Sequence, residues 1–197
     1  MKDVMKPSMY GVGVLGGVVS NEERSSKVYT SWSNMLKRCY SVKESAQRSS
    51  YEGCCVSNNF SNYQYFKNWY NNQIGHDRDG WNLDKDLLVK GNKVYSESTC
   101  VFIPQDINLL LTKCTASRGE YLIGVCWHKR DNTFVAMVNK NKGKSEHLGY
   151  FKTELEAYNA YKVAKEAFVK EQANKWKGKI DLRAYEALMN YTVEITD

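Results

Sequence analysis

Three strand-like runs followed by one long helical pattern constrain the fold more than any other feature of this sequence. The runs are "YLIGVCWHK", "TFVAMVNK" and "SEHLGYF", and the segments "RDN" and "KNKGK" between them have the composition of turns. From Thr153 onward apolar side chains recur at helical spacing, with Thr153 as the N-cap and Gly178 at the end. This order predicts a three-stranded antiparallel sheet packed on one helix.

Alternation within the strands predicts which side chains face that helix. Val125, Ala136, Val138 and Leu148 are the inward positions, and the small side chain of Ala136 allows the helix to approach closely. The opposite, outward face is expected to carry Cys126, His128, Arg130, Met137, Asn139, Lys140 and His147.

The first half of the chain has a different order of patterns. Residues 27–40, "KVYTSWSNMLKRCY", are a predicted helix, and "GCCVS" favours a short strand. The aromatic stretch "NNFSNYQYFKNWYNNQI" predicts a second helix, with Asn58 or Asn59 as its N-cap. Two short strands around a turn at 90–93, then a helix starting near Pro104, predict a ββα unit.

These patterns predict an α+β chain with two modules, at 27–112 and 118–178, that are not repeats of each other. Residues 1–26 are expected to form a loosely held leader. Residues 179–197 are expected to form a tail with a short helix at 181–190. A chain of 197 residues buries enough surface for such modules to fold without disulfide bonds.

Composition limits the classes of function. The six cysteines are unevenly spaced and no signal peptide precedes them, so we expect free thiols in a cytoplasmic protein. The longest apolar run, "YGVGVLGGVV", is shorter than the roughly 20 residues that span a bilayer. We therefore expect no membrane segment.

Charge favours an acidic partner. The formal net charge is +6, and the segment from Lys113 to Tyr150 holds seven Lys or Arg residues against three acidic ones. Such clustering is typical of a surface that binds nucleic acid. The plain alternative is a solvated basic sheet with Trp127 in a core.

The string "IGVCWHKRDNTFVAMVNKNKGKSEHLGYFKTELEAYNAYKVAK" resembles the AP2 domain, whose three-stranded sheet lies in the major groove of DNA. The plant-type pattern presents several arginines and a tryptophan on that sheet, whereas only Arg130 keeps a strong cation at the matching positions here, so base specificity is not carried over. The resemblance implies double-stranded DNA as partner, with contacts from Trp127, His128, Lys129, Arg130, Asn139, Lys140, Lys142, Lys144 and His147.

The segments "SWSNMLKRCY", "NYQYFKNWY", "LDKDLL", "GNKVYS", "TCVFIP" and "IN" resemble a phage HNH-type, or His-Me finger, endonuclease of the kind found beside AP2 domains in homing endonucleases. Position by position, Asp84 matches the ligand aspartate, Lys85 the general-base histidine, Thr99 the mid-motif asparagine and Asn108 the helix asparagine ligand. The resemblance implies Mg²⁺ or Mn²⁺ on Asp84 and Asn108, with Asp84 and Lys85 as catalytic residues.

Lys85 is the main departure from that pattern. To be half neutral near pH 7, its pKa would have to fall about three units below the usual value of about 10.4. The neighbouring Asp84 and Asp86 act in the opposite direction, so we expect Lys85 to contact phosphate as a charge. His76 is the alternative base. No CxxC pair is present, so we expect buried thiols rather than a zinc site.

The sequence thus leads to three hypotheses of function. The first is a DNA-binding protein of phage or mobile-element type that cuts phosphodiester bonds with Mg²⁺, acting in the host cytoplasm. The second is a nuclease-derived protein that binds DNA, or blocks access to it, without cutting. The third is an interaction module for an acidic protein partner. The oligomeric state and the target sequence are left open.

Overall fold

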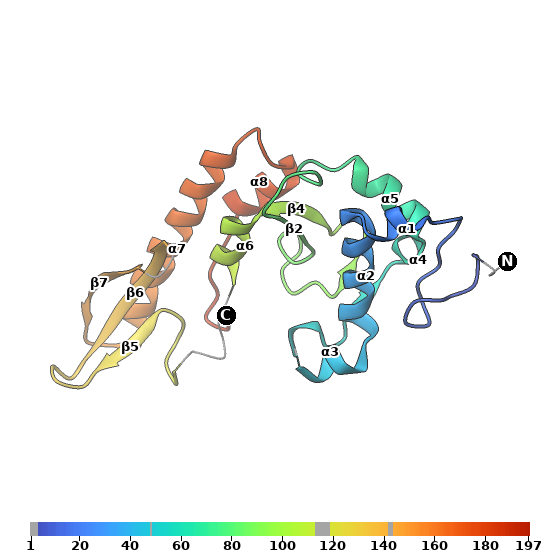
Figure 1. Ribbon diagram of the computed structural model, residues 1–197. Helices are drawn as coiled ribbons and strands as arrows, with labels where there is room; N and C mark the ends of the chain where they lie inside the picture. Colours follow the sequence, from blue (N-terminus) through green and yellow to red (C-terminus); the bar gives the residue numbers. More distant parts are fainter. Residues whose placement is uncertain (1–3, 48, 113–118, 142–143) are drawn as a thin grey trace. The chain divides into compact units, whose positions relative to one another are not determined.

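The chain forms two compact units, Met1–Gln105 and Asp106–Asp197. The computed structural model describes residues 4–47, 49–112, 119–141 and 144–197. Each unit combines helices with a small sheet (Figure 1), which confirms the α+β class. The boundary falls at Gln105, ahead of the predicted junction at 113–117, so nearly all of the helix that follows belongs to the second unit.

The first unit contains five α-helices, one 3-10 helix and four strands among its described residues. In chain order they are α1 (Asn21–Arg24), α2 (Lys27–Tyr40), α3 (Val42–Gln47), η1 (Ser49–Tyr51), β1 (Cys55–Val56), α4 (Asn58–Ser61), α5 (Tyr63–Asn71), β2 (Trp81–Asp84), β3 (Val94–Tyr95) and β4 (Val101–Pro104).

Aromatic side chains make the core of the first unit. Helix α2 buries the face that its spacing predicts, with Trp32 and Leu36 fully enclosed. The indole of Trp32 packs against the ring of Tyr63, and its Nε1 donates a 2.9 Å hydrogen bond to the Phe60 carbonyl oxygen. A buried indole keeps its donor satisfied in this way, so α2 is tied to both α4 and α5.

The predicted aromatic helix is divided at Asn62. Helix α4 is capped by Ser57 and helix α5 by Asn62, whose side chain accepts from the Tyr65 amide. Val14 forms a parallel bridge beside Asn62, because its amide donates to Ser61 and its carbonyl oxygen accepts from Tyr63. Backbone pairing with a distant segment thus replaces the intrahelical hydrogen bonds at this point.

The segment before α2 is packed rather than loosely held. Met9, Val12, Leu15 and Val19 lie against the first core. A Cβ atom on Gly13 would come within 2.5 Å of Leu36 and 3.1 Å of Trp32. Part of the apolar run at the start of the chain therefore packs against the core of the first unit, which sets it apart from the expected leader.

Two strand pairs complete the first unit. Strands β2 and β4 pair antiparallel, with Trp81 opposite Pro104 and Asp84 opposite Val101. Strand β3 pairs in parallel with β1. Helix α6 (Gln105–Leu111) follows β4 directly, beside the predicted start near Pro104. The chain order before it is β2, β3 and β4, so β3 lies between the two strands of the antiparallel pair.

The second unit holds the predicted meander. Strands β5 (Val125–His128), β6 (Thr133–Asn141) and β7 (Lys144–Phe151) form an antiparallel sheet with β6 in the centre, and α7 (Glu154–Trp176) lies along one face of it (Figure 1). Thr153 caps α7 in a capping box with Glu156, as the sequence predicts for the cap.

The predicted inward positions form the core between sheet and helix. Ala136 and Val138 are fully buried there with Ala157, and Val125 and Leu148 pack against them. Gly124 has a φ of +77°, and a Cβ atom on it would lie 2.1 Å from the ring of Tyr161. Only glycine allows that ring of α7 to approach the start of β5 so closely.

The last residues of the chain belong to the second unit as well. Helix α8 (Leu182–Met189) begins at its cap Asp181, close to the predicted bounds. Val193 is buried in the core beneath the sheet. The Glu166 carboxylate accepts the Val193 amide at 2.9 Å, and Tyr158 and Lys162 donate to the Val193 carbonyl oxygen. The expected tail is therefore fixed to α7. Among the described helices, none combines the length and apolar character of a membrane-spanning segment.

Candidate nucleic-acid interface and candidate metal site

The face of the β5–β6–β7 sheet away from α7 is the candidate nucleic-acid interface, called the outer face below. The strand register defines it: Cys126 lies opposite Val135, which lies opposite Tyr150, and Met137 lies opposite His147. A bulge between Ala136 and Met137 keeps this alternation across β7. The described outer-face residues are Cys126, His128, Thr133, Val135, Met137, Asn139, Ser145, His147 and Tyr150.

Tyr150 is the largest exposed side chain of this face, and it was missing from the predicted set. The residue is 55% exposed, and its ring lies between two histidines, with ring centroids 4.7 Å from His147 and 5.7 Å from His128. Phe151 pairs with the inward Phe134, so alternation alone places Tyr150 outward. Counting back from Phe151 would have found it from the sequence.

The turn between β5 and β6 carries the described cations nearest to the outer face. Lys129 and Arg130 are exposed, and Asn132 closes the turn with a φ of +49°. Arg130 donates from Nε to Asp131 at 2.9 Å, which lowers the pKa of the Asp131 carboxyl group. The nearby His128 imidazole lowers it further. Asp131 thus partly neutralises the turn.

His128 and Thr133 face each other at the end of this turn. Nδ1 of His128 lies 3.3 Å from the Asp131 carboxylate but without the geometry of a hydrogen bond, and the Thr133 hydroxyl has no partner among the described residues. Buried polar atoms without partners cost free energy. The hydrogen-bonding groups of these two side chains are therefore less well satisfied than those of the strands beside them.

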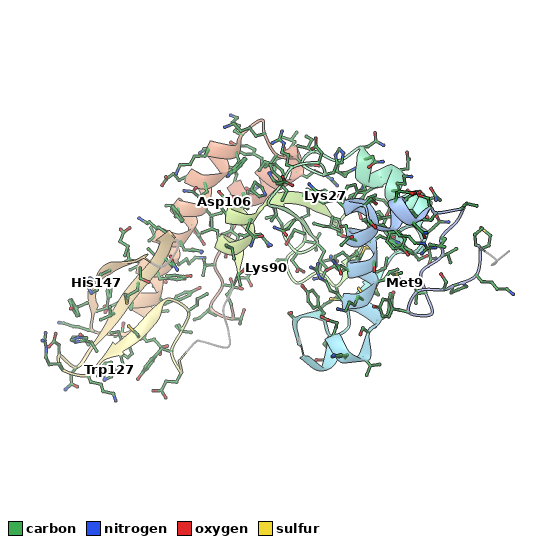
Figure 2. The ribbon with its side chains drawn as sticks, in the orientation of Figure 1. Met9, Lys27, Lys90, Asp106, Trp127 and His147 are labelled. Atoms are coloured by element: carbon green, nitrogen blue, oxygen red, sulfur yellow. The ribbon has the colours of Figure 1, made fainter. Side chains whose placement is uncertain are left out.

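Two predicted contacts lie on the wrong side of the sheet. Trp127 pairs with Phe134 and packs edge-on against its ring at 4.8 Å, so it shares the helix side with Phe134. Figure 2 labels Trp127 and His147 on this sheet. Lys140 follows the inward Val138, forms a 2.7 Å ion pair with Glu146 and acts electrostatically on Glu171 of α7. Neither residue belongs to the outer face.

The remaining predicted contacts divide into two groups. His128, Asn139 and His147 lie on the outer face, and Lys129 and Arg130 lie in the turn beside it. Lys142 and the side chain of Lys144 lie outside the described residues.

Asp84 ends β2 and begins a tight turn. Its Oδ1 accepts the amides of Asp86 at 2.9 Å and Leu87 at 2.7 Å. Burial raises the pKa of the carboxyl group, against the lowering effect of the Leu87 amide. A carboxylate held in place by two backbone amides has suitable oxygen chemistry for a hard cation.

The side chain of Lys85 is buried, with 4% of the residue exposed. Its Nζ donates to both Asp86 carboxylate oxygens at 2.7 Å and to the Asn92 carbonyl oxygen at 3.1 Å, and it lies over the Tyr95 ring. Burial alone would lower the pKa of Lys85, but the hydrogen bond and charge of Asp86 outweigh it and raise the pKa. This direction is the one the sequence predicts, and it opposes a role as general base.

Asn92 organises the loop between β2 and β3, and the sequence singled it out only as part of a turn. Its side-chain amide donates to the carbonyl oxygens of Lys85 and Val94, and its Oδ1 accepts the Val94 amide. Thr99 donates from its hydroxyl to the same Val94 carbonyl oxygen at 2.7 Å. The two side chains hold the loop that encloses Lys85.

Asn108 and His76 occupy different surroundings. Asn108 is half-buried in α6 of the second unit, whereas Asp84 belongs to the first, so their pairing on one cation stays a prediction. His76 packs edge-on against Tyr70, and its Nδ1 lies 2.8 Å from the Gln73 carbonyl oxygen. The described residues contain no group of three or more His, Cys, Asp or Glu side chains arranged to hold a metal ion.

The cysteines of the first unit are free thiols in the described residues. Burial raises the pKa of Cys39 and of Cys100 to about 12 in each case. Burial thus favours the neutral thiol form of these two side chains.

Comparison of the chain with models of protein families, with curated proteins and with solved structures found no match. The roles proposed for the candidate sites are therefore argued from their own residues and geometry.

Proposed function

We propose that this chain binds double-stranded DNA through the outer face of the β5–β6–β7 sheet. The observation that supports this most is the shape of that face: a three-stranded antiparallel sheet, backed by α7, that leaves its other side exposed with two cations at one end. The major groove is about 12 Å wide and admits β-ribbons. The AP2-like pattern of the sequence supports the same mode.

The cations of the turn supply the electrostatic part of binding. Lys129 and Arg130 are positioned to neutralise phosphates at the end of the sheet, and Lys142 and Lys144 are the further candidates. Each neutralised phosphate contributes about 0.9 to the slope of log affinity against log salt. We expect a slope of about 2 to 4 for the whole protein.

A salt titration of duplex binding tests this proposal. Fluorescence anisotropy of the full-length chain on labelled duplex, between about 50 and 200 mM salt, gives the slope directly. Lys129→Ala is expected to lower the slope by about one, whereas the matched Lys175→Ala on α7 leaves it unchanged. A flat salt dependence would favour an interaction module for an acidic protein instead.

A second candidate function is Mg²⁺-dependent cleavage of the bound DNA by the ββα unit, as in HNH-type endonucleases of phage and mobile elements. It is supported by the antiparallel β2–β4 pair that runs directly into α6, with Asp84 at the end of β2. Asp84 and Asn108 would hold the cation, which supplies positive charge at the scissile phosphate. Asp84 fixes its carboxylate through the two turn amides.

A nuclease-derived protein that binds without cutting is the competing proposal. It is supported by Lys85, because the ammonium group at the general-base position is buried and held by Asp86. Removing a general base typically costs about 10² to 10⁴-fold in rate. Cleavage by this chain therefore requires another base or a metal-bound hydroxide.

A plasmid assay separates cutting from binding. Supercoiled plasmid is incubated with the full-length chain and Mg²⁺ or Mn²⁺, alone and as Asp84→Ala, Asn108→Ala and the control Asp79→Ala, a carboxylate on the exposed surface. The nuclease proposal expects nicked or linear product that the first two variants lose and the control retains. Duplex binding with no product under either metal leaves the binding protein as the function.

A further inference from the structure

We infer that the outer face recognises A·T-rich duplex, with Met137 and Tyr150 contacting thymine methyl groups and Asn139 contacting adenine in the major groove. The inference rests on the proposed DNA-binding function and adds the class of base pair that the sheet selects.

The described positions of the outer face lack the side chains that recognise guanine most often. Its described positions carry no lysine or arginine; the cations Lys129 and Arg130 lie in the turn beyond β5. Guanine presents two acceptors in the major groove, and arginine or lysine is the commonest partner for them. Cations at the end of the sheet are instead positioned to contact phosphates. Phosphate contacts fix the orientation of a protein on the duplex but do not distinguish one base sequence from another.

The centre of the face is apolar and aromatic. Val135 is buried there between its register partners Cys126 and Tyr150, while Met137 is 38% and Tyr150 55% exposed. Apolar groups of this kind find one matching feature in the major groove, the thymine methyl group. A surface of this composition gains more from thymine than from cytosine, whose exposed amino group needs an acceptor.

Asn139 supplies the complementary contact. It is exposed, lies two residues after Met137 on β6 and faces Ser145 across the sheet. Two residues of strand rise by about 6.6 Å, which matches roughly two base-pair steps of about 3.4 Å. An asparagine side chain bonds adenine through its N6 and N7 atoms. Met137 and Asn139 thus fit two A·T pairs that lie two steps apart along one groove.

The test uses three duplexes of equal length whose central segments are A·T pairs, A·U pairs or G·C pairs. Uracil lacks only the methyl group of thymine, so A·U pairs keep the minor-groove pattern unchanged. Anisotropy with the full-length chain is expected to show tightest binding to the A·T duplex. Replacing thymine by uracil is expected to weaken binding about fourfold for each methyl group that becomes buried.

Variants assign the effect to residues. Met137→Ala is expected to bind the A·T and A·U duplexes with nearly equal affinity, whereas Met137→Leu keeps the preference for thymine. Asn139→Ala is expected to reduce the preference for A·T over G·C, whereas Lys175→Ala on α7, away from the sheet, is expected to leave it unchanged. Circular dichroism checks that each variant is folded.

Three outcomes overturn the inference. Equal affinity of the unchanged chain for A·T and A·U duplexes would show that no methyl group is contacted. Preference for G·C would show that another set of side chains faces the bases. Absence of binding to every duplex would overturn the proposed function together with the inference, whereas the first two outcomes leave DNA binding itself intact.

Discussion

Asp131 is the residue that most limits the positive charge beside the outer face. Its carboxylate accepts from Arg130 and lies 3.3 Å from the His128 imidazole. Asp131→Asn removes this competitor for Arg130, so the proposed function predicts tighter duplex binding, by roughly two- to fivefold at low salt. Anisotropy with and without the substitution measures it. Glu186→Gln on α8 serves as the control for loss of one surface charge, and equal gains in both variants would contradict a local effect.

Two glycines allow the cost of a Cβ clash to be separated from the cost of a positive φ angle. Gly124 and Gly178 both have φ above +70°, but only at Gly124 would a Cβ atom meet a neighbour, the Tyr161 ring. Gly178→Ala is expected to cost about 1 kcal/mol from backbone conformation alone. Gly124→Ala adds overpacking and is expected to cost about 2 to 4 kcal/mol. Denaturant unfolding of the two variants gives the comparison; equal losses would mean that the ring moves away without cost.

Single residues of the candidate sites were predictable where local sequence dominates their surroundings. The flanking acids of Lys85 gave the direction of its pKa from the sequence, and the structure has the same direction. Its burial and its bond to the Asn92 carbonyl oxygen depend on a loop that returns seven residues later. Neither the periodicity nor the composition of the sequence predicts that hydrogen bond.

At the scale of elements, the capping box of α7 is a local signal with a measurable effect. The Thr153 hydroxyl accepts the Glu156 amide, and the Glu156 carboxylate accepts the Thr153 amide. Thr153→Ala is expected to lower stability by about 1 kcal/mol, and Thr153→Ser to retain most of it. Thermal unfolding of both, with the exposed Thr192→Ala as control, checks the prediction. A loss with serine as large as with alanine would show that the methyl group, rather than the cap, matters.

Elements were predictable to the extent that their residues interact with near neighbours in the sequence. Helices α2 and α7 and strands β5 to β7 follow their periodicity closely. The break at Asn62 arises from Val14, far earlier in the chain, and the parallel pairing of β1 with β3 is equally long-range. Each of these features depends on a pairing partner that is distant in the sequence and that a local pattern does not identify.

At the scale of the whole molecule, both ends of the chain are parts of its units. Glu23 holds the N-terminal segment to α5, because its carboxylate accepts from the Tyr63 hydroxyl at 2.9 Å and from the Lys67 ammonium at 2.5 Å. These bonds, the one from Lys67 first, lower the pKa of Glu23 below its usual value.

A pH prediction follows from that lowered pKa. The carboxylate stabilises the fold at pH values above its unfolded pKa of about 4.3, and this contribution is lost as pH falls through the lower folded value. Glu23→Gln is therefore expected to lower the unfolding temperature by about 2 to 4 °C near neutral pH, with the difference shrinking below about pH 4. Thermal scans across pH measure it, with Glu52→Gln as an exposed control. A difference independent of pH would mean that the charge of Glu23 contributes nothing.

The sequence by itself determined the α+β class, the sheet-on-helix order of the second unit and the inward residues of its core, because alternation and helical spacing are properties of neighbouring residues. The tertiary structure alone decided the packing of Met9, Val12, Leu15 and Val19 against the first core and the enclosure of Lys85. Those outcomes depend on contacts and loop closure between segments that are distant in the sequence. The same distinction applies to Tyr150, whose place follows from alternation but whose two histidine neighbours come from separate strands.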